Sequence, residues 1–234
     1  MREKYYNEAQ RIHLPPRDCW ENHPSVINFP SWEAISPRPL LWLSGPESSP
    51  GVSWVSAFSV DLIDSLSVND KLVAAYVFCS NDNEDLELTP LVILKRLIAS
   101  LLSSFPNITI SHIAVLSLGR FQYVGSSPFL AWRLLSEILE ILQEVMMEQQ
   151  QELYIIIDRL DICGSSSEDF GVRKDLIPRL QEISQRWRNT RVVITSTAMA
   201  ERVGTLKGDD GWVWPVWFDS SVALDMGNSN FYDD

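Results

Sequence analysis

A loop rich in glycine, proline and serine, GPESSPGVS at residues 45–53, separates an apolar run from a stretch with helical spacing. The backbone N–H groups of such a loop can converge on a phosphate, while a lysine neutralises its charge and a Ser or Thr holds Mg²⁺. Gly45, Gly51 and Ser53 fit the pattern GxxxxGKS if one extra residue is allowed, and Val52 then takes the lysine position. A strand-to-helix turn can have the same composition without binding phosphate, so both interpretations stay open.

The second candidate is the aspartate that ends the apolar run ELYIIID, residues 152–158. A buried strand would fix the carboxylate of Asp158, and we expect the following loop to leave it exposed as a ligand for Mg²⁺ or its water. Asp161 follows three residues later and is a second candidate oxygen ligand. The alternative is an aspartate that starts the next turn.

The third candidate is Thr195, near the end of RVVITST. Its hydroxyl could sense the terminal phosphate of a nucleotide, or it could cap the turn that follows. In an open parallel sheet, ligands bind beyond the carboxyl ends of the strands. The three candidates therefore belong to one site if the runs that precede them are neighbouring strands.

The surrounding chain alternates apolar runs with stretches of helical spacing. Buried strands are predicted at residues 40–44, 71–80, 152–158 and 191–197. Helices are predicted at residues 52–66, 88–105, 127–151 and 172–188. WVWPVWF, residues 212–218, predicts an edge strand because Pro215 cannot donate to a central ladder. This order predicts an α/β fold, in which a parallel sheet carries helices on both faces through right-handed crossovers.

In this order the segments LLWLSGPESSPGVS, LVAAYVFCS, VILKRLIASLL, YIIIDRLDIC and VVITST resemble one known family. They are similar to the STAND-type P-loop NTPases, in particular the NACHT and nephrocystin-like N-terminal modules abundant in filamentous fungi. The resemblance covers roughly residues 32–197, and YIIIDRLDIC is its most specific part. It implies a three-layer P-loop NTPase-like core over residues 39–218, after a leader or linker at 1–38 that packs on the core and before an acidic tail at 219–234.

Three polar positions of the family pattern are lost in this chain. The lysine of the phosphate loop is replaced by Val52, the glutamate after the second aspartate by Ile162, and the arginine of the TSR strand by Thr197. We therefore expect no catalytic residues and negligible hydrolysis. If nucleotide binding is retained, the resemblance assigns it to Gly45, Gly51, Val52, Ser53 and Thr195. It assigns a metal to Ser53, Asp158 and Asp161.

The charge and the cysteines limit the other classes of function. A net charge of -12 opposes binding to the phosphates of DNA or RNA, so we expect no nucleic-acid partner. Three scattered cysteines suit a reducing, cytoplasmic location, and no apolar run is long enough to insert in a membrane. Trp212, Trp214 and Trp217 form either an edge of the core or an exposed patch for a protein partner.

The leading hypothesis is a pseudo-NTPase that serves as a protein-interaction or regulatory module, with no cofactor. The alternative is a slow Mg²⁺-dependent ATPase or GTPase switch, in which Lys95, Arg96 or Lys174 replaces the missing lysine and ATP or GTP with Mg²⁺ is the cofactor. A weaker third possibility is a crevice for another small molecule, since fold alone does not define function. Three isolated histidines do not indicate a metal site.

Overall fold

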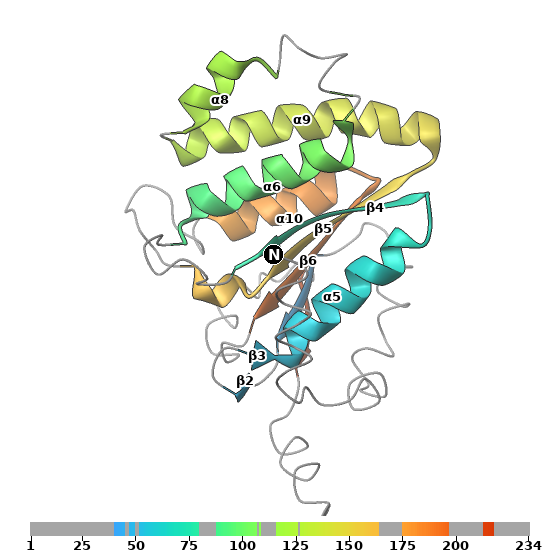
Figure 1. The fold of residues 1–234 in the computed structure, drawn as a ribbon, viewed down its shortest axis with the longest axis vertical. Helices are drawn as coiled ribbons and strands as arrows, with labels where there is room; N and C mark the ends of the chain where they lie inside the picture. The colour runs from blue at the N-terminus through green and yellow to red at the C-terminus, as the bar shows by residue number, and fades with distance from the viewer. Residues whose placement is uncertain are drawn as a thin grey trace, which may run out of the picture.

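A five-stranded parallel sheet, ordered β4-β5-β6-β1-β7, forms the centre of the computed structural model (Figure 1). The structure describes residues 40–44, 47–49, 52–79, 88–106, 108, 116–125, 127–163, 175–196 and 213–217. The strands of the sheet are β1 (Leu40–Ser44), β4 (Leu72–Phe78), β5 (Glu152–Asp158), β6 (Thr190–Ser196) and β7 (Val213–Trp217). All five predicted strands are confirmed. The strand that contains Pro215 lies at the edge of the sheet, as its missing N–H requires.

Five α-helices are present in the described part of the chain. They are α5 (Trp54–Ser67), α6 (Pro90–Ser104), α8 (Leu118–Val124), α9 (Pro128–Gln149) and α10 (Ile177–Arg186). Pro90 occupies the first turn of α6, where an N–H would lack an intrahelical acceptor, and the Thr89 hydroxyl caps this turn by accepting from the Val92 N–H. The spacing predicted four of these helices; α8 was not predicted.

Two short elements at the carboxyl edge of the sheet were also not predicted. A two-stranded antiparallel hairpin joins β2 (Glu47–Ser49) to β3 (Val52–Ser53). A 3₁₀ helix, η1 (Leu160–Ile162), follows β5. Both elements are too short to have a periodic pattern in the sequence.

Helices cover both faces of the sheet and create two cores. Alternate residues of β5 show the division: Leu153, Ile155 and Ile157 face the larger core under α6, α9 and α10, while Tyr154 and Ile156 face the smaller core under α5. Each of these five side chains is buried. The predicted unbroken apolar run of a doubly covered parallel strand is confirmed. The molecule is a three-layer α/β structure (Figure 1).

The topology brings the candidate residues to one edge. From β1 the chain crosses one face through α5 to the far strand β4, and then returns through β5 and β6 with its helices on the other face. Between the first crossover and the later ones, the direction of travel across the sheet reverses and so does the face that the helices cover. The crossovers therefore all have the same hand, as expected for parallel sheets. The carboxyl ends of β1, β5 and β6 therefore meet, with Ser44 paired to Ser196.

Parts of the predicted organisation lie outside the described residues. They are the leader at 1–38, the acidic tail at 219–234, Gly45, Gly51, Lys174 and Thr197. Among the helices that the structure does describe, none combines the length and apolar character needed to cross a bilayer.

Candidate functional site at the carboxyl edge of the sheet

Asp158 lies at the end of β5 and is surrounded by hydroxyl groups. Its Oδ2 accepts a hydrogen bond of 2.8 Å from the Ser56 hydroxyl. Its Oδ1 accepts one of 2.9 Å from Ser59 and one of 2.6 Å from Thr195. We call these four residues the Asp158 cluster. Asp158 is only 1% exposed, so the prediction that the following loop leaves its carboxylate exposed is wrong.

The physical reason is the position of α5. Ser56 and Ser59 are three residues apart, so both lie on the same face of the first turns of this helix. That face covers the end of β5. The hydroxyls therefore approach the carboxylate from one side, while Thr195 approaches from the neighbouring strand β6.

Burial raises the pKa of Asp158 above its ordinary value, because a charged carboxylate loses its hydration inside the protein. The hydrogen bonds from Thr195, Ser56 and Ser59 act in the opposite direction, since they stabilise the charged form. The positive charge of Arg159 also lowers the pKa, by less. Desolvation outweighs these effects, so this carboxyl group binds its proton more tightly than an exposed aspartate does.

Thr195 joins two strands through its side chain. Its Oγ1 donates to Asp158 and accepts a hydrogen bond of 3.0 Å from the backbone N–H of Arg159. The residue is fully buried. The structure thus brings Thr195 to Asp158, as the order of the predicted strands required. Its role in sensing a phosphate stays a prediction.

Asp161 lies in η1 and is paired with Arg159. The Arg159 Nε is 3.2 Å from Oδ1, and Nη2 is 3.2 Å from Oδ2. Both side chains are nearly buried, at 7% and 11% exposed. Arg159 adopts a left-handed conformation with φ of 57°, which is uncommon outside glycine and turns the chain sharply after β5. Both carboxylate oxygens of Asp161 thus bond to a cation of the protein itself.

The loop after β1 pairs with itself. Glu47 is opposite Ser53 and Ser49 is opposite Val52 in the antiparallel hairpin. Backbone pairing within the loop competes with convergence of its N–H groups on a phosphate. The side chains of Val52 and Ser53 lie outside the described part, so the nucleotide and metal roles predicted for them stay predictions.

Two of the cations considered as substitutes for the lysine are described. Arg96 of α6 donates from Nη1 to the Phe78 carbonyl at 3.1 Å, at the end of β4. Lys95 instead donates from Nζ to the Gly125 carbonyl at 2.9 Å, at the end of α8. Because Phe78 is paired with Asp158 in the sheet, Arg96 is the cation that reaches the candidate edge.

A family model identifies the family to which the chain belongs. The family described as "Nephrocystin 3, N-terminal" matches residues 25–197, well over half of the chain. The chain belongs to this family. The predicted resemblance to nephrocystin-like modules is therefore confirmed, and the fold is that of a P-loop NTPase-like α/β module. The search of curated proteins found no match.

Several of the solved structures similar to this nephrocystin-like chain are of origin-recognition proteins. A chain of Drosophila ORC bound to poly(dA/dT) DNA and Cdc6 has a TM-score of 0.49 at 14% identity, covering 96% of this chain and 34% of that one. The Aeropyrum pernix ORC2 protein has a TM-score of 0.43 at 13% identity, covering 87% and 48%. The chain thus spans less than half of either structure.

Sequence reasoning missed three residues of this nephrocystin-like site. Ser56 and Ser59 are predicted only as part of the helix at residues 52–66, and Arg159 belongs only to the segment YIIIDRLDIC. The available signal was the three-residue spacing of two serines in the helix after the loop, since it places two hydroxyls on one face. Within the described ranges, no group of three or more His, Cys, Asp or Glu side chains lies close enough to hold a metal ion.

Proposed function

We propose that this nephrocystin-like domain is a pseudo-NTPase. It keeps the P-loop NTPase-like core as a protein-interaction or regulatory module, binds nucleotide weakly or not at all, and does not hydrolyse it. The observation that carries the proposal is the state of Asp158, whose carboxylate is 1% exposed and accepts three hydrogen bonds from hydroxyls of the protein.

A Mg²⁺ site needs an open, ionised carboxylate. Magnesium binds oxygen at about 2.0–2.1 Å in a near-octahedral shell and usually keeps several waters. In the Asp158 cluster the hydroxyls of Ser56, Ser59 and Thr195 occupy the surroundings of both carboxylate oxygens. Burial also favours the protonated form, which does not bind metal. Both properties oppose a metal ligand at this position.

The sequence adds a second line of support. Val52 replaces the lysine that neutralises the β- and γ-phosphates, and Ile162 replaces an acidic residue of the family pattern. Each tenfold loss of rate corresponds to about 1.4 kcal/mol of barrier, so the loss of several charged groups makes hydrolysis negligible. The free thiol of the buried Cys79 fits the proposed cytoplasmic location, which is reducing.

One observation favours the alternative, a slow Mg²⁺-dependent ATPase or GTPase. Arg96 places a guanidinium at the end of β4, beside the strand that ends in Asp158. Such a cation could take the role of the missing lysine. This alternative requires Asp158 to leave its hydroxyl partners when nucleotide binds.

Thermal unfolding with millimolar ATP, ADP or GTP and Mg²⁺ tests the proposal. A ligand that binds only the native state stabilises it by about 2.7 kcal/mol at 100 times its Kd. We expect no rise in the midpoint beyond that caused by Mg²⁺ alone, and no phosphate release above buffer. A nucleotide-dependent rise together with phosphate release, both absent in Arg96→Gln and unchanged in Lys95→Gln, would contradict the proposal and support the alternative.

A further inference from the structure

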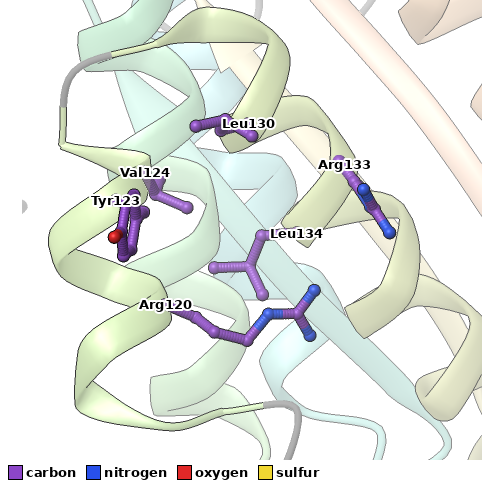
Figure 2. A pocket seen from close by; sticks show the side chains of 6 residues that line it. All are labelled: Arg120, Tyr123, Val124, Leu130, Arg133 and Leu134. Atoms are coloured by element: carbon purple, nitrogen blue, oxygen red, sulfur yellow. The ribbon is translucent and has the colours of Figure 1, made fainter.

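A small pocket lies between α8 and α9, on the side of the larger core away from the sheet. Its volume is about 200 Å³, and its lining combines aliphatic and cationic side chains (Figure 2). The residues that line it are Arg120, Tyr123, Val124, Leu130, Arg133 and Leu134. Figure 2 shows both guanidinium groups on one side of the pocket and the Tyr123 ring on the other. We call this the α8–α9 pocket.

Two exposed apolar side chains line this pocket. The exposed large apolar residues in the described part of the chain are Val68, Tyr123, Phe129, Leu130 and Met147. Two of them, Tyr123 and Leu130, line the pocket, and Tyr123 is 75% exposed. Single exposed apolar residues are ordinary on a protein surface, but these two border a hollow that a side chain of a ligand can fill.

Two of the residues that line the pocket are arginines. Arg120 and Arg133 both contact the carboxylate of Glu137, so two guanidinium groups share one negative charge. Arg120 forms two bonds with it, Nη1 to Oε2 at 2.5 Å and Nη2 to Oε1 at 2.9 Å. Arg133 is thus a largely exposed cation at this pocket, on a chain whose net charge is -12.

Arg133 is the group that offers this charge to a ligand. Its side chain is 73% exposed, and it contacts Glu137 through Nε at 3.2 Å. The two terminal nitrogens are the part of the guanidinium group that can pair with a carboxylate of a ligand. Arg120 has the supporting role, because its two bonds to Glu137 hold α8 against α9.

The volume of the pocket limits the size of the ligand that it can bind. Small-molecule sites have volumes of about 300–1,000 Å³, so this pocket is too small for a nucleotide or another ligand of that size. It can take one or two apolar side chains over Val124, Leu130 and Leu134. An arginine at the rim then selects a carboxylate beside them.

We propose that the α8–α9 pocket binds a segment of a partner protein in which an aliphatic or aromatic side chain lies next to an aspartate or glutamate. The apolar side chain enters the pocket, and the carboxylate pairs with Arg133. This inference rests on the interaction role in the proposed function, for which it names the surface and the chemistry of the partner.

Peptide selection on the full chain tests the inference. A phage library of random 12-residue peptides is panned on the wild-type chain and counter-selected on Arg133→Glu. Enriched peptides are then synthesised and their affinity is measured by fluorescence polarisation. We expect an acidic residue beside Leu, Ile, Met or Phe in the enriched set, and an affinity that falls at least tenfold in Arg133→Glu and in Tyr123→Ala.

The matched control is Lys71→Glu, which makes the same reversal of charge at an exposed residue that does not line the pocket. It should leave the peptide affinity within twofold of wild type. All three residues are exposed, so thermal midpoints near that of wild type will show that the variants fold.

Several results would overturn the inference. These are no enrichment, enriched peptides without acidic residues, equal loss of affinity in Lys71→Glu, or self-association in sedimentation that Arg133→Glu abolishes. The last result would assign the pocket to a second copy of this chain. The nucleotide experiment has a separate readout. Phosphate release above buffer would contradict the pseudo-NTPase proposal and leave the peptide result intact. Failure of the peptide selection would leave the nucleotide result intact.

Discussion

Asp158 connects three elements through a single carboxylate. It belongs to β5, receives two hydroxyl groups from α5 and receives a third from β6. Fully buried charged groups are rare unless they are hydrogen-bonded, and here both oxygens have partners. At the scale of the residue, the aspartate that resembles a metal ligand thus acts as a structural connection.

This role predicts a strong dependence of stability on Asp158. Asp158→Ala leaves the Ser56 and Thr195 hydroxyls without an acceptor and opens a small cavity, so we expect a loss of about 2–4 kcal/mol in the free energy of unfolding. Asp158→Asn keeps the shape and most hydrogen bonds, and should lose less. Asp70→Ala, at an exposed site, is the control and should stay within about 0.5 kcal/mol of wild type in urea titrations.

The pH dependence of the free energy of unfolding tests whether the pKa of Asp158 is raised in the folded protein. The pKa of Asp158 is raised in the folded state, so its contribution is fully present below the unfolded pKa and is lost as pH rises through the folded pKa. The stability of wild type relative to Asp158→Asn should therefore increase as the pH falls from 7 towards 4. A constant difference across this range would show that burial does not shift the pKa.

At the scale of the element, α8 is held to α9 by a surface ion pair. The bond from Arg120 is the main cause of a lowered pKa of Glu137, and the bond from Arg133 adds to it. Both Arg120 and Glu137 are partly exposed, so solvent screens their interaction. The pair therefore orients α8 at the pocket more than it stabilises the fold.

Glu137→Gln should accordingly cost little, at most about 1 kcal/mol, and high salt should reduce the difference. Since the folded pKa of Glu137 is lowered, its contribution is present above the unfolded pKa and is lost as pH falls through the folded pKa. Thermal unfolding of wild type and Glu137→Gln at two salt concentrations measures the salt effect, and the same comparison at lower pH measures the pH effect. Glu144→Gln, an exposed position on the same helix, is the control. A loss well above 1 kcal/mol would mean that the pair supports the core.

At the scale of the whole molecule, the inner strand β5 belongs to both cores. Ile155 lies in the larger core and Ile156 in the smaller one, and both are fully buried. Each layer therefore depends on the same strand for its apolar contacts. The two cores should unfold as one cooperative unit.

Ile155→Ala and Ile156→Ala test this coupling. Each deletes buried methyl and methylene groups, so each should lower the free energy of unfolding by about 2–5 kcal/mol. In both variants, far-UV circular dichroism and tryptophan fluorescence should report the same urea midpoint. Separate midpoints would show that the layer formed by α5 unfolds independently.

The sequence by itself determined the order of the elements and the edge at which the candidate residues meet. The apolar run at residues 152–158 became β5 with the same bounds, because a strand covered on both faces has no polar alternation. The edge position of the strand with Pro215 followed from its missing N–H. These features depend on patterns within a segment, which a single sequence contains.

Only the tertiary structure decided what surrounds Asp158 and what lines the α8–α9 pocket. The Ser56 hydroxyl reaches a carboxylate 102 residues away, and Arg120 reaches Glu137 on another helix. Such contacts depend on how α5 lies over the sheet and how α8 lies on α9. Packing between elements sets these positions, and no spacing along the chain contains that information.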